Sequence, residues 1–226
     1  MCASKNSPPR HVLEDNLKFI TGVLTDFEWF VFYGTLLGIE REGNLIEGDD
    51  DIDIYVNIKH RDELLRRLQG CSLEVPSNIF PNNSKYFTQV FRCSAGISSA
   101  MDLYFYTIDE NKNLLIDRFN FFGRVDDKKF HLHIPRSLVF PLRKNDQMGF
   151  TVVTPNKVTK LLTYVYGKNW MTPLKKTGAN KRYFHVMIKN RPFVFQGLAS
   201  PFLYFLYRKL FLRSLSLYRL IANKKS

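Results

Sequence analysis

Hydrophobic residues recur along the chain at intervals that predict its helices. Between residues 11 and 28, large apolar side chains are spaced four and three residues apart, so an α-helix would carry them on one face. These residues are Leu13, Leu17, Ile20, Leu24 and Phe27. Shorter helices are predicted over residues 36–41, 60–69 and 154–166. The last of them is expected to begin with Thr154 as N-cap and Pro155 in its first turn.

The segment 51–58 shows the alternation of a β-strand. One face would carry Ile52, Ile54, Val56 and Ile58, and the other Asp51, Asp53, Tyr55 and Asn57, which predicts a half-buried strand with a polar face. Further strands are expected over residues 29–33, 87–92, 100–107, 130–134 and 150–153. This order of elements favours an α+β domain with a mixed sheet over residues 1–170, followed by a basic helical tail over residues 171–226.

The composition fits one folded domain with an appendage, since the chain has 226 residues and 45% of them are hydrophobic. Three cysteines, Cys2, Cys71 and Cys93, are odd in number and lack paired spacing, so neither a disulfide framework nor a cysteine zinc site is expected. No secretory signal is visible, and the uncharged stretch 192–207 is shorter than the ~20 apolar residues of a membrane span. These features predict a cytoplasmic protein.

The net charge of +12 is concentrated at one end of the chain. Residues 171–226 hold 12 of the 33 lysines and arginines and none of the 21 acids, which leaves 21 residues of each sign in residues 1–170. A helix over residues 202–221 would separate its basic side chains from its apolar ones. Two interpretations stay open: peripheral contact with an anionic membrane surface, or packing of the apolar side on the domain. A nucleic-acid partner is not expected, because the acidic strand would then have no role.

The densest acidic cluster in the chain lies at the start of the strand predicted over residues 51–58. Asp51 and Asp53 would point to the same side with Cα atoms about 6.6 Å apart, and their charges would repel by roughly 2.5 kcal/mol. A divalent cation offsets such repulsion, and carboxylate oxygens suit Mg²⁺ or Mn²⁺. A solvated acidic loop is the plainer alternative, but the intervening isoleucines anchor the segment in a core. An EF-hand loop starting at Asp49 is excluded, because Ile54 and His60 occupy the positions that need Gly and Glu.

Four further residues are candidates for the same site. Asp102 lies in an apolar and aromatic strand, where an unpaired aspartate is costly to bury, and it is predicted to be the third metal ligand. Gly34 and Thr35, between a strand and a short helix, are predicted to offer a backbone N–H and a hydroxyl to a phosphate. Arg41 is predicted to bind phosphate as well.

The residues from Tyr33 to Ile46, YGTLLGIEREGNLI, together with DDDIDI from Asp49, closely resemble the signature of the LicD family, which fukutin and fukutin-related protein share. A second, shorter match includes Val153-Thr154-Pro155 and YGKNWM from Tyr166. Gly48 stands where members often have Trp, Thr35 replaces the usual Ser, and the zinc-binding insertion of fukutin-related protein has no counterpart.

The resemblance implies a nucleotidyltransferase-like fold, related to DNA polymerase beta, in which Asp51, Asp53 and Asp102 match the metal-binding and catalytic acids. It also implies transfer of a phospho-alcohol, such as phosphocholine or a polyol phosphate, from a CDP-linked donor to a glycan or glycolipid hydroxyl with release of CMP. Lipopolysaccharide or teichoic acid synthesis would be a typical setting. The alternatives are transfer of a nucleoside monophosphate from a nucleoside triphosphate with release of pyrophosphate, and a DxD glycosyltransferase of the GT-A kind.

Overall fold

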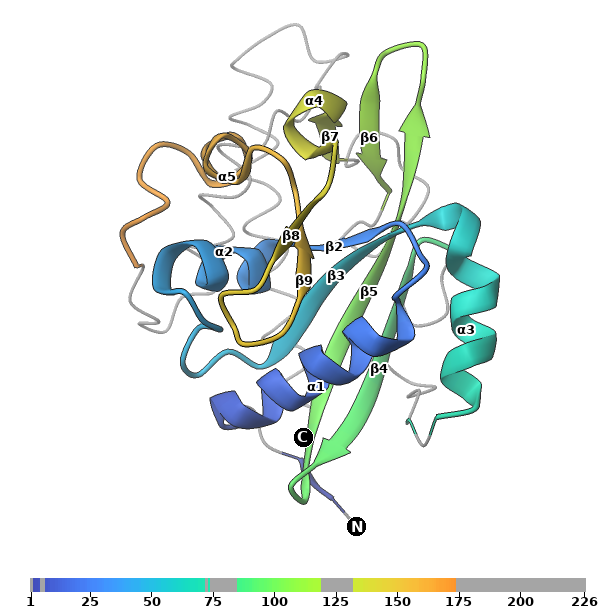
Figure 1. The fold of residues 1–226 in the computed structure, drawn as a ribbon, viewed down its shortest axis with the longest axis vertical. Helices are drawn as coiled ribbons and strands as arrows, with labels where there is room; N and C mark the ends of the chain where they lie inside the picture. The colour runs from blue at the N-terminus through green and yellow to red at the C-terminus, as the bar shows by residue number, and fades with distance from the viewer. Residues whose placement is uncertain (1, 5–6, 72, 74–84, 119–131, 174–226) are drawn as a thin grey trace, which may run out of the picture. The chain divides into compact units, whose positions relative to one another are not determined.

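The computed structural model describes residues 2–4, 7–71, 73, 85–118 and 132–173 (Figure 1). The chain divides into two units, residues 1–193 and 194–226, and every described residue belongs to the first. The amphipathic helix predicted over residues 202–221 therefore lies outside the described residues, as do the first two residues of the strand predicted over 130–134.

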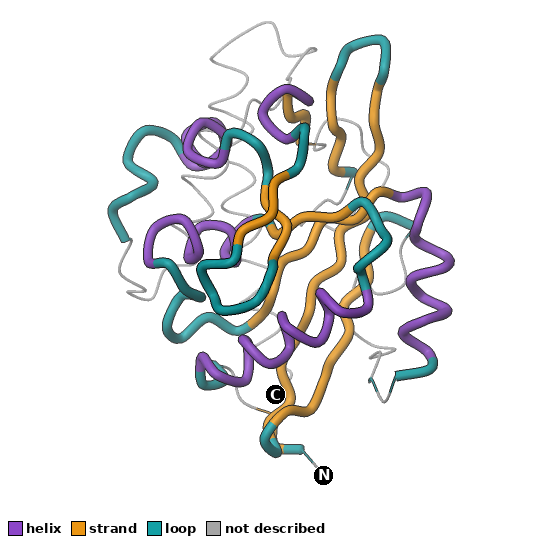
Figure 2. Tube along the Cα trace, viewed as in Figure 1, coloured by secondary structure: helices purple, strands orange, loops and turns teal. Residues whose placement is uncertain are grey.

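The described domain is built on a mixed sheet, as the order of predicted elements indicated (Figures 1 and 2). Its strands are β1 (Ala3–Ser4), β2 (Trp29–Val31), β3 (Asp51–Asn57), β4 (Phe87–Ser94), β5 (Ile97–Asp109), β6 (Leu114–Asp117) and β7 (Leu132–Pro135). The order β2-β3-β5-β6-β7 forms the main path, and β1 and β4 also pair with β5. β3 runs parallel to β5, whereas β2, β4 and β6 run antiparallel to their partners. The long strand β5 thus organises the sheet, with β3 beside it.

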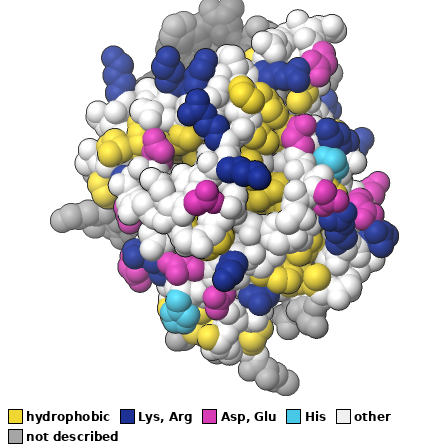
Figure 3. Space-filling view, in the orientation of Figure 1, with side chains coloured by type: hydrophobic (Ala, Val, Ile, Leu, Met, Phe, Trp, Pro, Cys, Tyr) yellow, Lys and Arg dark blue, Asp and Glu magenta, His cyan; other side chains and the backbone are white. Residues whose placement is uncertain are grey.

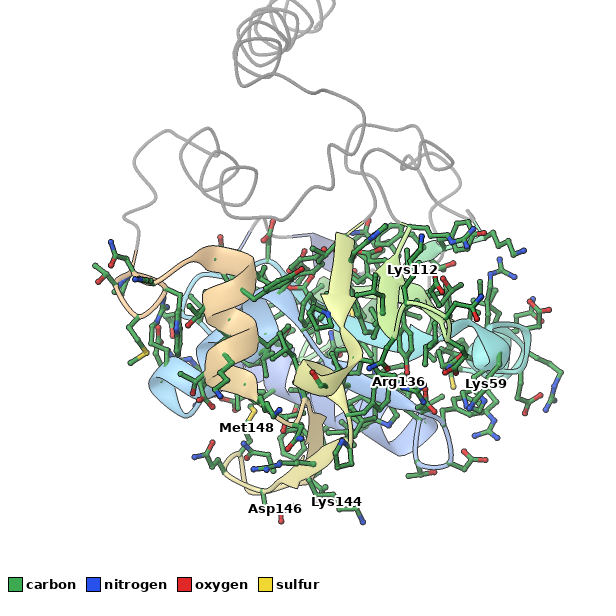
Figure 4. All side chains as sticks on the ribbon, turned by 90° about the horizontal axis from the view of Figure 1, so that it is seen from above. Lys59, Lys112, Arg136, Lys144, Asp146 and Met148 are labelled. Carbon is green, nitrogen blue, oxygen red and sulfur yellow. A yellow bond between two sulfur atoms is a disulfide. The ribbon has the colours of Figure 1, made fainter. Side chains whose placement is uncertain are left out.

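Helices cover this sheet and join its strands: α1 (Arg10–Val23), α2 (Tyr33–Glu42), the 3₁₀ turn η1 (Ile58–His60), α3 (Arg61–Gln69), α4 (Arg136–Val139) and α5 (Val158–Tyr166). α1 crosses one face of the sheet over β3, β4 and β5 (Figure 1). α2 packs against β3 and α5. A second, small sheet pairs β8 (Arg143–Asn145) with β9 (Val152–Thr154), and Figure 4 shows Lys144 and Asp146 on this hairpin.

The central strand β3 is buried on both faces, so the prediction of a half-buried strand with a polar face is wrong. Ile52, Ile54 and Val56 are fully buried on one face, as their alternation predicts. On the other face Asp53 is 6% exposed and Tyr55 is fully buried. Aromatic rings from β2, α2 and β5 pack around Tyr55, and these tertiary contacts cannot be read from the strand itself.

The predicted helix boundaries differ from the observed ones at three places. α2 begins at Tyr33, three residues before the predicted start and within the segment expected to be a strand. α1 ends at Val23, whereas the apolar periodicity continued to residue 28. Thr154 is the last residue of β9, opposite Arg143, and is not the N-cap of α5, which begins at Val158. The backbone N–H groups of residues 156 and 157 donate to the carbonyls of Val139 and Leu138 in α4, and this tertiary contact delays the helix.

No disulfide framework was expected, but Cys2 and Cys93 form one disulfide, with Cα atoms 6.0 Å apart. β1 lies parallel to the start of β5, and β4 pairs antiparallel with the same residues of β5. This arrangement brings together two cysteines that are 91 residues apart in sequence. Local spacing in the sequence could not predict their pairing. Cys71 is the free cysteine of the described residues.

The surface of the described domain carries both signs of charge (Figure 3). Arg67, for example, binds both carboxylate oxygens of Asp26 at 2.6 and 2.8 Å and also contacts Glu63 at 3.0 Å. This mixture agrees with the balanced charge of residues 1–170. Within the described part of the chain, no helix has the length and apolar character to cross a membrane.

Candidate functional site

The pairing of β3 with β5 brings the three predicted acids together. Asp53 lies directly opposite Asp102 in the parallel register of the two strands, and Asp51 precedes Asp53 by two residues on the same face. Carboxylate oxygens of Asp51, Asp53 and Asp102 all lie within 4.8 Å of one another. Asp53 and Asp102 are 6% and 7% exposed, so two of the three carboxylates are held in the protein interior.

The first turn of α2 fixes Asp53 in place. The N–H of Gly34 donates to Oδ2 of Asp53 at 2.9 Å, and Oγ1 of Thr35 accepts from the backbone N–H of Asp53 at 2.8 Å. The first N–H groups of a helix have no partner within the helix, so Gly34 is free to bind a carboxylate there. Gly34 and Thr35 were predicted to bind phosphate directly, whereas in this structure both hold Asp53.

A side chain at position 34 would crowd the carboxylates of the site. A Cβ built on Gly34 would lie 2.8 Å from Oδ2 of Asp49 and 3.3 Å from Oδ2 of Asp53. A contact at 2.8 Å is too short for a real Cβ, so the Asp49 carboxylate would have to shift and that of Asp53 would have to give by a few tenths of an ångström. The close approach of α2 to the acids therefore explains the glycine that the sequence motif contains.

Arg41, the third predicted phosphate contact, lies at the other end of α2. Seven residues separate it from Gly34, which corresponds to about 10 Å along a helix. Its Nε donates to Oε1 of Glu42 at 3.0 Å, and its side chain is 10% exposed. A role for Arg41 in phosphate binding stays a prediction.

Burial and mutual repulsion shift the protonation of the acids. Burial raises the pKa of Asp53 well above its usual value, and the charges of Asp51, Asp102 and Asp49 raise it further. Burial also raises the pKa of Asp102 to about 6, against the lowering effect of hydrogen bonds from Gln89 and Tyr104. The fold thus holds carboxylates where their charge is unfavourable without a compensating cation.

The chemistry of these side chains fits a hard divalent cation. All the candidate ligand atoms are carboxylate oxygens, which Mg²⁺ and Mn²⁺ prefer over nitrogen or sulfur. A second group of neighbouring oxygens, from Asp49, Asp50 and Asp51, adjoins the first through the shared Asp51. A cation bound by Asp51, Asp53 and Asp102 would relieve the repulsion that raises the pKa of Asp53.

Two residues of the site were missed from the sequence. Gln89 lies opposite Asp102 on β4, and its Nε2 donates to Oδ1 of Asp102 at 2.7 Å. The hydroxyl of Tyr104 lies 3.3 Å from Oδ1 of Asp53 and 3.3 Å from Oδ2 of Asp102. Asp102 and Tyr104 are two residues apart on one strand, so their position on the same face could have been predicted. The strand register that places Gln89 beside Asp102 cannot be predicted from the local sequence.

The family model described as "LicD/FKTN/FKRP, nucleotidyltransferase domain" matches residues 26–157, which is more than half of the chain and includes the whole acid site. This chain belongs to the LicD family. It is a transferase of that family, and its mixed sheet with flanking helices is the LicD nucleotidyltransferase domain.

No curated protein matches the chain. Among solved structures, the crystal structure of the lincosamide antibiotic adenylyltransferase LnuA with lincomycin bound is similar, with 11% sequence identity and a TM-score of 0.47 over 67% of this chain and 85% of that chain.

Proposed function

We propose that this LicD protein transfers a phospho-alcohol group, such as phosphocholine or a polyol phosphate, from a CDP-activated donor to a glycan hydroxyl and releases CMP. The observation that carries the proposal is the cluster of Asp51, Asp53 and Asp102, whose oxygens lie within 4.8 Å of one another inside a LicD domain. Three carboxylates on rigid neighbouring strands form a site that binds Mg²⁺ or Mn²⁺, which when bound neutralises charge on a diphosphate.

Each acid has a distinct part in this proposal. Asp51 and Asp53 hold the cation, and the N–H of Gly34 keeps the Asp53 carboxylate oriented toward it. Asp102 completes the cation site and accepts the proton of the attacking glycan hydroxyl. The hydroxyl oxygen forms a bond to the distal phosphorus of the donor, while the bond from that phosphorus to the oxygen of CMP breaks.

A donor panel tests this function. The protein is incubated with CDP-choline, CDP-ribitol, CDP-glycerol and nucleoside triphosphates in Mg²⁺ or Mn²⁺, with glycan acceptors, and the products are separated. CMP formed from a CDP-alcohol, and its loss in Asp53→Asn, supports the proposal. Pyrophosphate from a nucleoside triphosphate would instead support transfer of a nucleoside monophosphate, and consumption of a nucleotide sugar would support glycosyl transfer.

We also propose that the basic segment 171–226 holds the enzyme at an anionic membrane, where a lipid-linked glycan acceptor would lie. The support is its charge, with 12 basic residues and no acid. Flotation of the full chain with vesicles that contain anionic lipid, and loss of flotation in a chain that ends at Pro173, is the expected result. Equal flotation of both chains would contradict it.

A further inference from the structure

A buried carboxylate outside the acid cluster ends strand β6. Asp117 is 1% exposed. The hydroxyl of Tyr33 donates to its Oδ2 at 3.0 Å, and the hydroxyl of Tyr55 contacts the same oxygen. The two tyrosine hydroxyl oxygens lie 3.1 Å apart. A buried polar group is retained only where hydrogen bonds compensate its loss of water, so Asp117 and the two tyrosines form a linked unit.

Tyr33 has a backbone conformation that a large side chain rarely adopts. Its φ is +39°, in the left-handed region, where a bulky residue costs of order 1–3 kcal/mol. It is also the first residue of α2, immediately before Gly34. The direction of the Gly34 N–H toward Asp53 therefore depends on a strained residue, and the hydrogen bond to Asp117 is one of the contacts that hold it.

The side chains provide a second connection between Asp117 and the acids. The ring of Tyr104 lies with its centroid 5.3 Å from the rings of both Tyr33 and Tyr55. The hydroxyl of Tyr104 in turn contacts Asp53 and Asp102. Tyr55 is two residues from Asp53 on the same face of β3. A shift of the tyrosine pair would thus reach the acid cluster through packing as well as through the backbone.

We propose that Asp117 is a positioning residue for the metal-binding acids, which holds Tyr33 in its left-handed conformation and so keeps the N–H of Gly34 on Asp53. This inference rests on one part of the proposed function, the binding of a divalent cation by the acids. Asp117 itself touches neither cation nor substrate. It acts through Tyr33 and Tyr55, in the way that residues behind metal ligands orient those ligands.

The test compares Mn²⁺ affinity and thermal stability in variants of the full chain, with affinity measured far below the melting temperature. Asp117→Leu removes the acceptor of both hydroxyls, and a loss of about 10-fold in Mn²⁺ affinity is expected, the scale for residues behind a metal ligand. Asp117→Asn keeps one oxygen acceptor and should lose less. If Asp117→Leu does not fold, Tyr33→Phe provides the same comparison, since it removes one of the two hydroxyls and keeps the ring.

The matched control is Ser99→Ala, because Ser99 is also buried and its Oγ accepts from Nδ2 of Asn16 at 2.6 Å, in the contact between α1 and β5. This variant should lower the melting temperature and leave Mn²⁺ affinity unchanged. If Asp117→Asn and Tyr33→Phe also lower only the melting temperature, Asp117 is purely structural and the proposal is overturned.

The outcome is separable from that of the donor panel, since Mn²⁺ binding needs no donor. Weakened Mn²⁺ binding in the Asp117 variants, with no CMP from any CDP-alcohol, would support the positioning role and contradict the phosphotransferase. Unchanged Mn²⁺ binding in Asp53→Asn would overturn both, because the acids that Asp117 positions would then bind no cation.

Discussion

Replacing Asp102 by Asn should stabilise the metal-free protein at pH 8 while it damages the site. The pKa of Asp102 rises from 3.8 to about 6 in the folded state, chiefly because the carboxyl is buried. Below pH 3.8 the carboxyl is protonated in the folded and the unfolded chain, so folding carries no penalty from it. As pH rises from 3.8 through about 6, the unfolded chain releases the proton more readily, and stability is lost.

The size of the effect follows from the same pKa change. Each tenfold change in proton affinity corresponds to about 1.4 kcal/mol, so a rise from 3.8 to about 6 costs the folded state about 3 kcal/mol at pH 8. Asparagine does not ionise and keeps an oxygen that can accept from Gln89. For a domain of this size, about 3 kcal/mol corresponds to roughly 6–12 °C in melting temperature.

Thermal melts of wild type and Asp102→Asn in EDTA, from pH 4 to pH 8, measure this directly. The variant should melt higher at pH 8, and its advantage should shrink as pH falls toward 4. The control is Asp146→Asn, on the exposed β8–β9 hairpin, which should change stability by no more than about 0.5 kcal/mol. If Asp102→Asn melts at or below the wild-type temperature at pH 8, the fold does not raise the pKa of the Asp102 carboxyl, and the argument is contradicted.

Two substitutions in the first turn of α2 test how that turn holds the acids. Gly34→Ala places a Cβ 2.8 Å from Oδ2 of Asp49 and should reduce the transfer rate about 100-fold, the effect of displacing reacting groups by about 1 Å, whereas Gly22→Ala in α1 meets no atom within 4 Å and should leave the rate unchanged. Equal rates in the two variants, measured as CMP release, would contradict this account. Thr35→Val removes the acceptor of the buried Asp53 N–H and should cost about 1–3 kcal/mol in the free energy of unfolding, measured by urea titration, while Thr35→Ser should restore most of it. A valine variant as stable as wild type would indicate that the N–H has another partner.

The acid site was largely predictable because local rules decide most of it. Alternation on one strand places Asp51 and Asp53 on the same face whatever the rest of the fold does. The cost of burying an unpaired acid singled out Asp102 in its apolar strand. The parallel pairing that sets Asp53 opposite Asp102 is a property of the whole sheet and was not predicted; the resemblance to a known family implied only that the three acids share a site.

The parts that were missed depend on contacts between distant segments. The hydrogen bond from the Gly34 N–H to Asp53 was not predicted, because it depends on the packing of α2 against β3, and phosphate binding by Gly34 and Thr35 stays a prediction. The left-handed conformation of Tyr33 and its hydrogen bond to Asp117, 84 residues away, cannot be predicted from the hydrophobic and polar pattern around Tyr33. The disulfide between Cys2 and Cys93 likewise depends on two strands that meet at β5.

The central claim is that Asp51, Asp53 and Asp102 together bind a divalent cation. A titration of Mn²⁺ followed by electron paramagnetic resonance, on wild type and Asp53→Asn at pH 7.5, tests it most directly. The account predicts saturable binding by wild type and a loss of affinity of about 100-fold in the variant, because one charge and one ligand oxygen are gone while the N–H of Gly34 keeps an acceptor. Equal affinities for Mn²⁺ in the two proteins would contradict it.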